Sequence, residues 1–376
     1  MPDSSRSTLR RNPVVRAAAR RLPGPLKQQV KDALARRVRR GRKPVIGLAG
    51  FFGAGNYGDE LFLSVYEQYF GDEFELRVLA DNMTKPYYDR PLAEIVDEVD
   101  AILIGGGDIL QPWQADPRYF NHKMLAKPVF VVGIGVPIYR NTQIKPGIIE
   151  KHKRFLEHPN VRFIGVRDQP TADWILANIS ADLDILVAPD MVCSLELPPA
   201  EKPEGAPILG VVTRFRPNLD EPDDYSRVEE MAGKAMADGW RVRHLILGTM
   251  DVGRRDMANA DDLDIPGKEV VYTESLDELT RSIGECTAFA SMKFHGSVVA
   301  TMYGVPSIVM IPTNKNRNFM KRIGLGANVS DFAAADLAER FADRVVPATD
   351  DVAGLRTAAD AHLRELRAEV KQALGL

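Results

Sequence analysis

The chain has 376 residues, of which 45% are hydrophobic and 27% charged, and its formal net charge is -3. This balance is typical of a globular protein, and the sequence has no run of about 18 apolar residues that would predict a membrane span. Its two cysteines, Cys193 and Cys286, stand far apart, which argues against a disulfide framework and indicates a reducing cytoplasm.

The first 43 residues differ in charge from the rest of the chain. They contain 14 Lys and Arg residues against two acids, whereas the remainder is acidic. The segment lacks the apolar core of a secretory signal. Residues 26–40 have the spacing of a basic amphipathic helix, and a disordered leader is the alternative. For this leader, residues 1–43, we expect peripheral contact with an anionic membrane and no nucleic-acid partner.

Residues 44–196 alternate apolar runs with helical patterns, which predicts an N-terminal Rossmann-like domain with a parallel sheet. The first strand leads into the loop F-F-G-A-G-N-Y-G-D-E, in which Gly55, Asn56 and Asp59 precede or open a helix. Glycines at such a turn let a ligand approach the backbone closely. The loop has neither the lysine of a P-loop nor the spacing of a dinucleotide-binding turn.

Further strands of this first domain also end in glycine or charged residues. The strand over 101–104 is followed by Gly106, Gly107 and Asp108, and the strand over 162–166 is followed by Arg167. Open α/β sheets bind ligands beyond the carboxyl ends of their strands. The repeated placement of polar residues at strand ends therefore predicts one shared site at this edge of the sheet.

A Pro-rich polar segment, residues 197–206, predicts a linker to a second Rossmann-like domain over 207–348, and residues 349–376 form a C-terminal amphipathic helix. Arg214 comes at the end of a strand. Lys293 and His295 lie between a short strand and a helix, whose free N–H groups favour an anion. A cation and an imidazole there suggest an anionic ligand with proton chemistry nearby, and a purely structural elbow is the alternative.

Six motifs in fixed order carry a resemblance to a known family: G-N-Y-G-D-E at 55–60, I-L-I-G-G-G at 102–107, G-V-R-D at 165–168, A-P-D at 188–190, M-K-F-H-G at 292–296 with G-V-P at 304–306, and K-N-R-N-F-M-K-R-I-G-L at 315–325. The chain resembles the polysaccharide pyruvyl transferase family over roughly residues 45–325. The resemblance implies a two-domain fold of the glycosyltransferase B type with two Rossmann-like halves facing a cleft. It also implies transfer of enolpyruvate from phosphoenolpyruvate to a sugar, leaving a pyruvate ketal. We expect no cofactor besides this donor substrate and no metal, because the other histidines form no ligand-spaced cluster.

By position in these motifs, the resemblance implies catalytic roles for His295 and Asp59. Lys293 stands where the family usually has Arg; Lys keeps the charge but loses the bidentate fork. Asp108 is a reserve candidate for the carboxylate that takes a hydroxyl proton. The residues expected to bind substrate are Arg167, Lys293, Lys315, Arg214, Gly55, Asn56, Gly106, Gly107 and Asp108.

Several of these residues have structural interpretations as well. Arg167 can form an ion pair between domains, Asp59 can cap a loop, Arg214 can face solvent, and Asp190 can shape a turn. For the whole chain, the alternatives are a glycosyltransferase that uses a nucleotide-sugar and an inactive scaffold that binds saccharides. The resemblance implies a lipid-linked or polymeric glycan as acceptor, and a cytoplasmic location at the inner face of the membrane.

Overall fold

A computed structural model describes residues 42–138, 142–215, 223–258 and 260–376. The chain divides into two compact units, Met1–Pro44 and Val45–Leu376. The helix expected over residues 26–40, and nearly all of the basic leader, lie outside the described residues. No helix in the described ranges combines the length and apolar character needed to cross a bilayer.

The first sheet has six parallel strands in the order β2-β1-β3-β4-β5-β6. Its central strands read as nearly unbroken apolar runs, because both faces of the sheet are covered by helices. The strands are β1 (Val45–Ala49), β2 (Glu75–Val78), β3 (Ala101–Gly107), β4 (Val129–Ile134), β5 (Val161–Val166) and β6 (Leu186–Val187).

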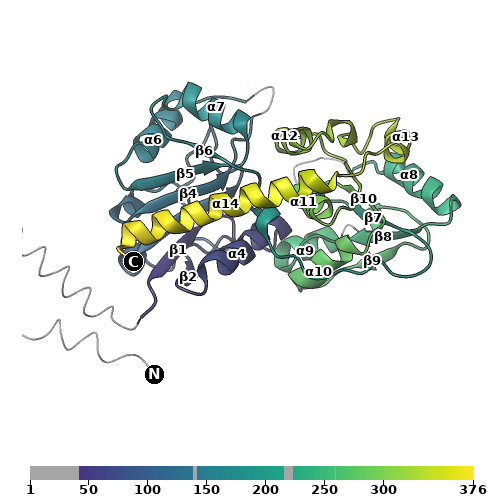
Figure 1. The fold of residues 1–376 in the computed structure, drawn as a ribbon, viewed down its shortest axis with the longest axis horizontal. Coiled ribbons are helices and arrows are strands. Elements are labelled where there is room, and N and C mark those ends of the chain that lie inside the picture. The colour runs from purple at the N-terminus through teal and green to yellow at the C-terminus, as the bar shows by residue number, and fades with distance from the viewer. Residues whose placement is uncertain (1–41, 139–141, 216–222, 259) are drawn as a thin grey trace, which may run out of the picture. The chain divides into compact units, whose positions relative to one another are not determined.

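Alternate residues of the first sheet pack into two separate cores. Ile46 and Leu103 face a core that includes α4, whereas Ile102 and Val131 face a core that includes the helices α5, α6 and α7. Figure 1 labels α4, α6 and α7 beside the strands of this sheet. The helical segments here are α4 (Tyr57–Phe70), α5 (Leu92–Asp97), η1 (His122–Ala126), α6 (Pro146–Leu156), α7 (Gln169–Asn178) and η2 (Met191–Ser194).

The second sheet has five parallel strands in the order β11-β10-β7-β8-β9. Residues 195–207, which precede it, form no helix or strand. Its strands are β7 (Ile208–Val212), β8 (Arg241–Leu245), β9 (Glu269–Val271), β10 (Ala288–Ser291) and β11 (Ser307–Val309). Its helical segments are α8 (Ser226–Ala237), α9 (Met250–Ala258), η3 (Ala260–Asp262), α10 (Leu276–Gly284), α11 (Phe294–Met302), α12 (Asn314–Arg322), η4 (Gly326–Asn328) and α13 (Leu337–Ala342).

The chain ends in the long helix α14 (Thr349–Leu374), which contacts α4, β5, η2 and α11. Its apolar stripe is buried, as the periodicity of the sequence predicts. The Tyr69 hydroxyl donates a hydrogen bond to Asp360, and Lys371 pairs with Glu73 at 2.8 Å, so polar contacts flank the stripe. Gly375 ends the helix in the left-handed conformation, with φ of 69°.

Candidate active site

Both sheets direct charged residues to the carboxyl ends of their strands. From the first sheet, Asp59 lies in the first turn of α4 after β1, and Arg167 directly follows β5. From the second sheet, His295 lies in the first turn of α11 after β10, and Lys315 in the first turn of α12 after β11. Side chains from these four elements act on one another, so the structure brings the sequence-predicted residues together.

Arg167 and Lys315 share one carboxylate. The guanidinium of Arg167 contacts Oδ1 of Asp108, and Nζ of Lys315 lies 3.2 Å from Oδ2 of Asp108. Burial acts to raise the pKa of Asp108, but the two cations outweigh it and lower the pKa below its ordinary value. Asp108 is therefore an anion supplied by the protein itself. Its position marks the point where Arg167 and Lys315, from different sheets, converge.

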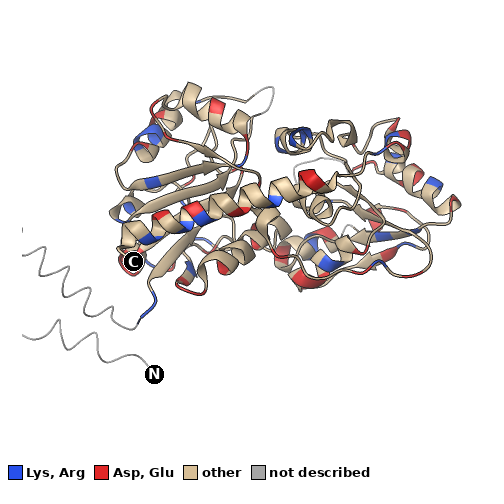
Figure 2. Cartoon of the chain, viewed as in Figure 1, with Lys and Arg blue, Asp and Glu red and all other residues tan. Residues whose placement is uncertain are grey.

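The guanidinium of Arg167 has capacity for a further anion. Its side chain is only 4% exposed, and no described residue accepts a hydrogen bond from its Nε or Nη1. Buried donors without partners are rare in native structures, and they suit a ligand that supplies oxygen atoms. Lys315 belongs to α12, which has four basic and no acidic residues, and Figure 2 marks the basic positions on the ribbon of this helix in blue.

His295 lies against the first turn of α4. A Cβ atom added to Gly58 would lie 1.7 Å from Nδ1 of His295, so the ring occupies the space that a side chain would need. Phe62, one turn further along α4, meets the ring edge-on with centroids 5.0 Å apart. The absence of a side chain at Gly58 thus permits the contact between α11 and α4.

Asp59, the residue after Gly58, is a buried carboxyl group with a perturbed pKa. Burial raises its pKa from 3.8 to about 6, although His295 opposes the shift, and the Asn56 side chain donates a hydrogen bond to it. A carboxyl group with this pKa can exchange protons near neutral pH. The neighbouring Glu60 has a different task, because it accepts hydrogen bonds from the backbone N–H groups of Gly53 and Gly55 and so fixes the loop.

The glycines of the predicted site let backbones approach closely. Gly55 has φ of 83°, and its carbonyl accepts a hydrogen bond from the N–H of Thr249 at 2.9 Å. A Cβ at Gly55 would lie 1.9 Å from the Thr249 carbonyl oxygen. Gly106 and Gly107 both have positive φ, and Gly107 faces Asp59. The loop at Gly55 therefore joins the two sheets, while the pair at the end of β3 borders the acid-base residues.

Lys293, which the sequence places in the substrate site, is engaged by the protein itself. Its ammonium group pairs with Asp256 and donates a hydrogen bond to the Leu247 carbonyl at 2.6 Å. Burial lowers the pKa of Lys293, Asp256 opposes the shift, and Arg214 adds to it. Lys293 and Arg214 thus lie near each other, and the ammonium group of Lys293 links the residues before α11 to α9 and to the segment after β8.

Asp190 is the site residue that the sequence interpretation assigned only to a turn. It does cap η2, because its Oδ1 accepts the N–H of Val192 at 3.0 Å. Its Oδ2 lies 3.4 Å from Nε2 of His295. Its position after a strand, in the A-P-D motif, was the available signal; the contact with His295, from a distant part of the chain, was not visible in the sequence.

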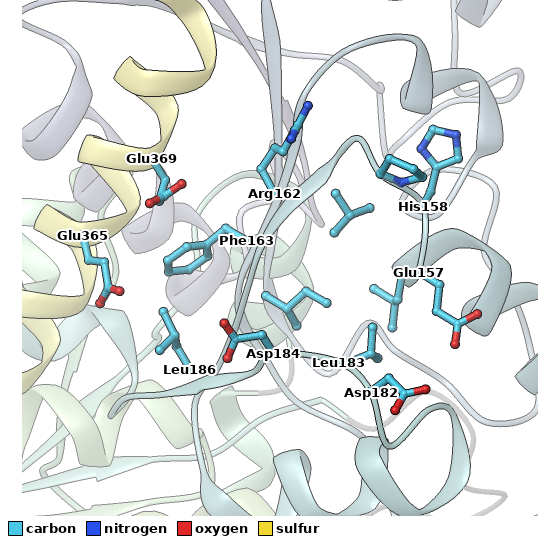
Figure 3. Close-up of a pocket in the computed structure, with 14 residues that line it drawn as sticks. Glu157, His158, Arg162, Phe163, Asp182, Leu183, Asp184, Leu186, Glu365 and Glu369 are labelled. Carbon is cyan, nitrogen blue, oxygen red and sulfur yellow. The ribbon is translucent and has the colours of Figure 1, made fainter.

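A pocket of about 620 Å³ lies elsewhere, between β5, β6 and α14, and Figure 3 shows its lining. The lining includes Arg162 and a larger number of acidic residues, which are Glu157, Asp182, Asp184, Glu365 and Glu369. Such a lining repels an anionic ligand. None of the predicted site residues lines this pocket.

Among the residues that the structure describes, no group of three His, Cys, Asp or Glu side chains is arranged to bind a metal.

Comparison with known proteins identifies the class. The family model described as polysaccharide pyruvyl transferase matches residues 56–314, and the chain belongs to this family. It is therefore a transferase of the class that modifies polysaccharides, as the six motifs predicted. No curated protein sequence matches the chain.

Solved structures define the fold. The S. aureus MnaA–UDP structure is 9% identical, covers 88% of this chain and 97% of its own, and has a TM-score of 0.53. The UDP-GlcNAc 2-epimerase of Methanocaldococcus jannaschii is 11% identical, with coverage of 86% and 99% and a TM-score of 0.52. At this identity the similarity concerns the fold alone. It confirms the prediction of two Rossmann-like domains of the glycosyltransferase B type.

Replacing Gly58 with Ala tests the contact that positions His295. The added Cβ has no room beside Nδ1, so the ring must move, and we expect transferase activity to fall at least ~10-fold. The matched control is Gly233→Ala in α8, where nothing lies within 4 Å of the added atom. Both variants gain helix propensity of up to about 1 kcal/mol. Equal activity of the two variants, measured with thermal unfolding as a check, would contradict this packing.

The raised pKa of Asp59 predicts a pH-dependent stability. The folded state binds this proton more tightly than the unfolded chain, so its contribution is present below pH 3.8 and is lost as the pH rises through about 6. Relative to an Asp59→Asn variant, the free energy of unfolding should fall over this window by up to about 3 kcal/mol. Denaturant titrations at several pH values measure the difference. Parallel pH curves for the two proteins would show that Asp59 has an ordinary pKa.

Proposed function

We propose that the protein transfers enolpyruvate from phosphoenolpyruvate to two hydroxyl groups of a sugar in a polysaccharide or lipid-linked glycan, forming a pyruvate ketal. The observation that carries the proposal is the pairing of an anion site with an acid-base pair. Arg167 and Lys315 supply the cations, and His295 and Asp59 lie beside them. Family membership supports the same reaction class.

The anion site suits the donor. Phosphoenolpyruvate carries a phosphate and a carboxylate on the same carbon, C2, so it needs more than one fixed cation. Arg167 has donors without partners in the described part of the chain, and Lys315 is partly exposed beside it. We infer that the donor competes with Asp108 for these cations. Lys293 is already paired with Asp256, so its contribution to donor binding is electrostatic and secondary.

The acid-base pair suits the chemistry. A sugar hydroxyl adds to C2 of the donor while C3 gains a proton and becomes a methyl group. His295 donates this proton, and Asp59 accepts the proton of the hydroxyl. The second hydroxyl then displaces phosphate at C2, and the C–O bond to phosphate breaks. The proton of this second hydroxyl returns to His295, and the proton held by Asp59 leaves with the phosphate. The products, the pyruvate ketal and inorganic phosphate, then account for every atom of the reactants.

The remaining parts of the proposal concern the surroundings of the reaction. The acceptor is a lipid-linked or polymeric glycan, and the reaction takes place in the cytoplasm. The 14 Lys and Arg residues within residues 1–43 provide peripheral attraction to an anionic membrane, each worth about 1 kcal/mol near the surface.

Incubation with phosphoenolpyruvate and a panel of glycans tests the proposal. Mass spectrometry should detect one pyruvate ketal per modified sugar, with release of an equal amount of phosphate. In the His295→Ala variant, turnover should fall by ~10²–10⁴-fold, because proton transfer to carbon is lost. Affinity for phosphoenolpyruvate should stay within about tenfold, because binding depends on Arg167 and Lys315. His122→Ala, at an exposed histidine, is the matched control.

Two results would contradict the proposal. Turnover of a nucleotide-sugar in place of phosphoenolpyruvate would identify a glycosyltransferase. Binding of glycans without turnover of either donor would identify a scaffold that has lost catalysis.

A further inference from the structure

A buried carboxylate lies beside the ring of His295. Asp190 is 2% exposed, and its Oδ2 lies 3.4 Å from Nε2 of His295. Both atoms are buried, and within the described residues neither has a hydrogen-bond partner elsewhere. Buried polar atoms need partners, so this geometry favours a shared proton, with the N–H at Nε2 donating to the carboxylate.

The orientation of Asp190 is set by its second oxygen. Oδ1 accepts the N–H of Val192 at 3.0 Å and so caps η2. This segment contacts α4, α11 and α14. Because the cap fixes one oxygen on a segment packed against three helices, the other oxygen is the one that remains for the ring.

The two ring nitrogens of His295 have different surroundings. Nε2 faces Asp190, whereas Nδ1 lies against Gly58, next to Asp59 in the first turn of α4. The His295 side chain is 12% exposed, so part of the ring is accessible although Nε2 is not. Because Nε2 is enclosed, Nδ1 is the ring nitrogen that remains for proton exchange with a substrate.

Within the described residues, charged and titratable groups from several elements act on this pair or on the segment that carries Asp190. Burial alone would raise the pKa of Asp190, but His295 and Arg167 lower it below its ordinary value, so Asp190 is an anion at neutral pH. The other groups that act on Asp190, on His295 or on the η2 segment are Asp59 and Tyr66 from α4, Asp108 after β3, Cys193 in η2, Arg322 from α12 and Arg356 from α14.

We propose that Asp190 is a positioning residue that keeps a proton on Nε2 of His295, so that Nδ1 is the nitrogen that exchanges protons with the substrate. The inference rests on the proposed pyruvyl transfer and assigns a specific atom to its proton step. When His295 gives a proton to C3, the proton leaves Nδ1. The neutral ring that remains carries its proton on Nε2, where the carboxylate of Asp190 accepts the hydrogen bond.

The Asp190→Asn variant separates this role from the cap. The asparagine carbonyl oxygen replaces Oδ1 as the acceptor for the N–H of Val192, so the cap and the volume are kept. The amide NH₂ group then faces Nε2 and donates to it. In the neutral ring, the proton must therefore move from Nε2 to Nδ1, which is the wrong tautomer for the proposed step.

Two measurements follow. Nitrogen NMR of histidine-labelled protein, with the His295 signal assigned by its loss in His295→Ala, should show the Nε2–H tautomer in the wild type and the Nδ1–H tautomer in Asp190→Asn. Steady-state kinetics with phosphoenolpyruvate should show kcat reduced by at least ~10²-fold with KM changed less than about threefold. Asp100→Asn is the matched control, because Asp100 also accepts a backbone N–H, from Val45 at 2.9 Å, but precedes β3 at the other end of the strands.

The outcomes are distinct from those of the proposed function. An Nδ1–H tautomer in the wild type would overturn the role of Asp190 even if Asp190→Asn failed to fold, and so would a wild-type kcat in Asp190→Asn. A wild type that shows the Nε2–H tautomer but forms no ketal would leave the Asp190–His295 pair standing and contradict the pyruvyl transfer instead.

Discussion

The packing of the His295 ring against Gly58 is the contact on which the rest of the site depends. The histidine comes from α11 beside the second sheet, and the glycine from α4 beside the first. A side chain at position 58 would keep the two helices apart by the width of a methyl group or more. With the ring in this position, Nε2 lies 3.4 Å from Asp190 and Nδ1 lies against Gly58, the residue before Asp59. Acid-base groups are thus assembled from both halves of the fold.

Three carboxyl groups of the site differ in their pKa values. Asp108 has two cations within reach and Asp190 has His295 and Arg167, so both have lowered pKa values, whereas burial dominates for Asp59 and raises its pKa to about 6. When the environments of neighbouring titratable groups separate their pKa values, the groups can take different roles as acid and base. Asp59 can trade a proton near neutral pH, while the other two carboxylates remain anions that order the groups around them.

Much of this arrangement could be predicted from the sequence. Parallel strands bring their carboxyl ends to one edge of a sheet, so the positions of Asp108 and Arg167 after strands of the first sheet predicted a common site. The corresponding position of His295 after a strand of the second sheet, together with the family motifs, predicted its part in that site. The glycine-rich loop predicted a close approach of a ligand to the backbone, and at Gly55 the group that approaches closely is the backbone of Thr249. The family motifs added Lys315, which lies after β11 in the first turn of the polar helix α12.

What the sequence could not supply was the pairing between distant side chains. Lys293 pairs with Asp256, which lies in α9, a helix that the sequence analysis did not predict. This pairing depends on how α9 packs against the residues before α11, and local residue patterns do not encode the packing of segments that are distant in sequence. The contact of Asp190 with His295 has the same origin. Helix α9 itself has an exposed, charged surface with two buried residues, Gly253 and Asp256, so it lacks the apolar stripe that identifies a helix.

A structure of the protein with phosphoenolpyruvate bound tests the central claim most directly. We expect the phosphate and carboxylate of the donor to contact the guanidinium of Arg167 and the ammonium of Lys315, with Asp108 displaced from at least one of them. The methylene carbon of the donor should lie on the Nδ1 side of His295. A donor bound away from both cations, or a methylene carbon out of reach of His295, would contradict the assignment of this site.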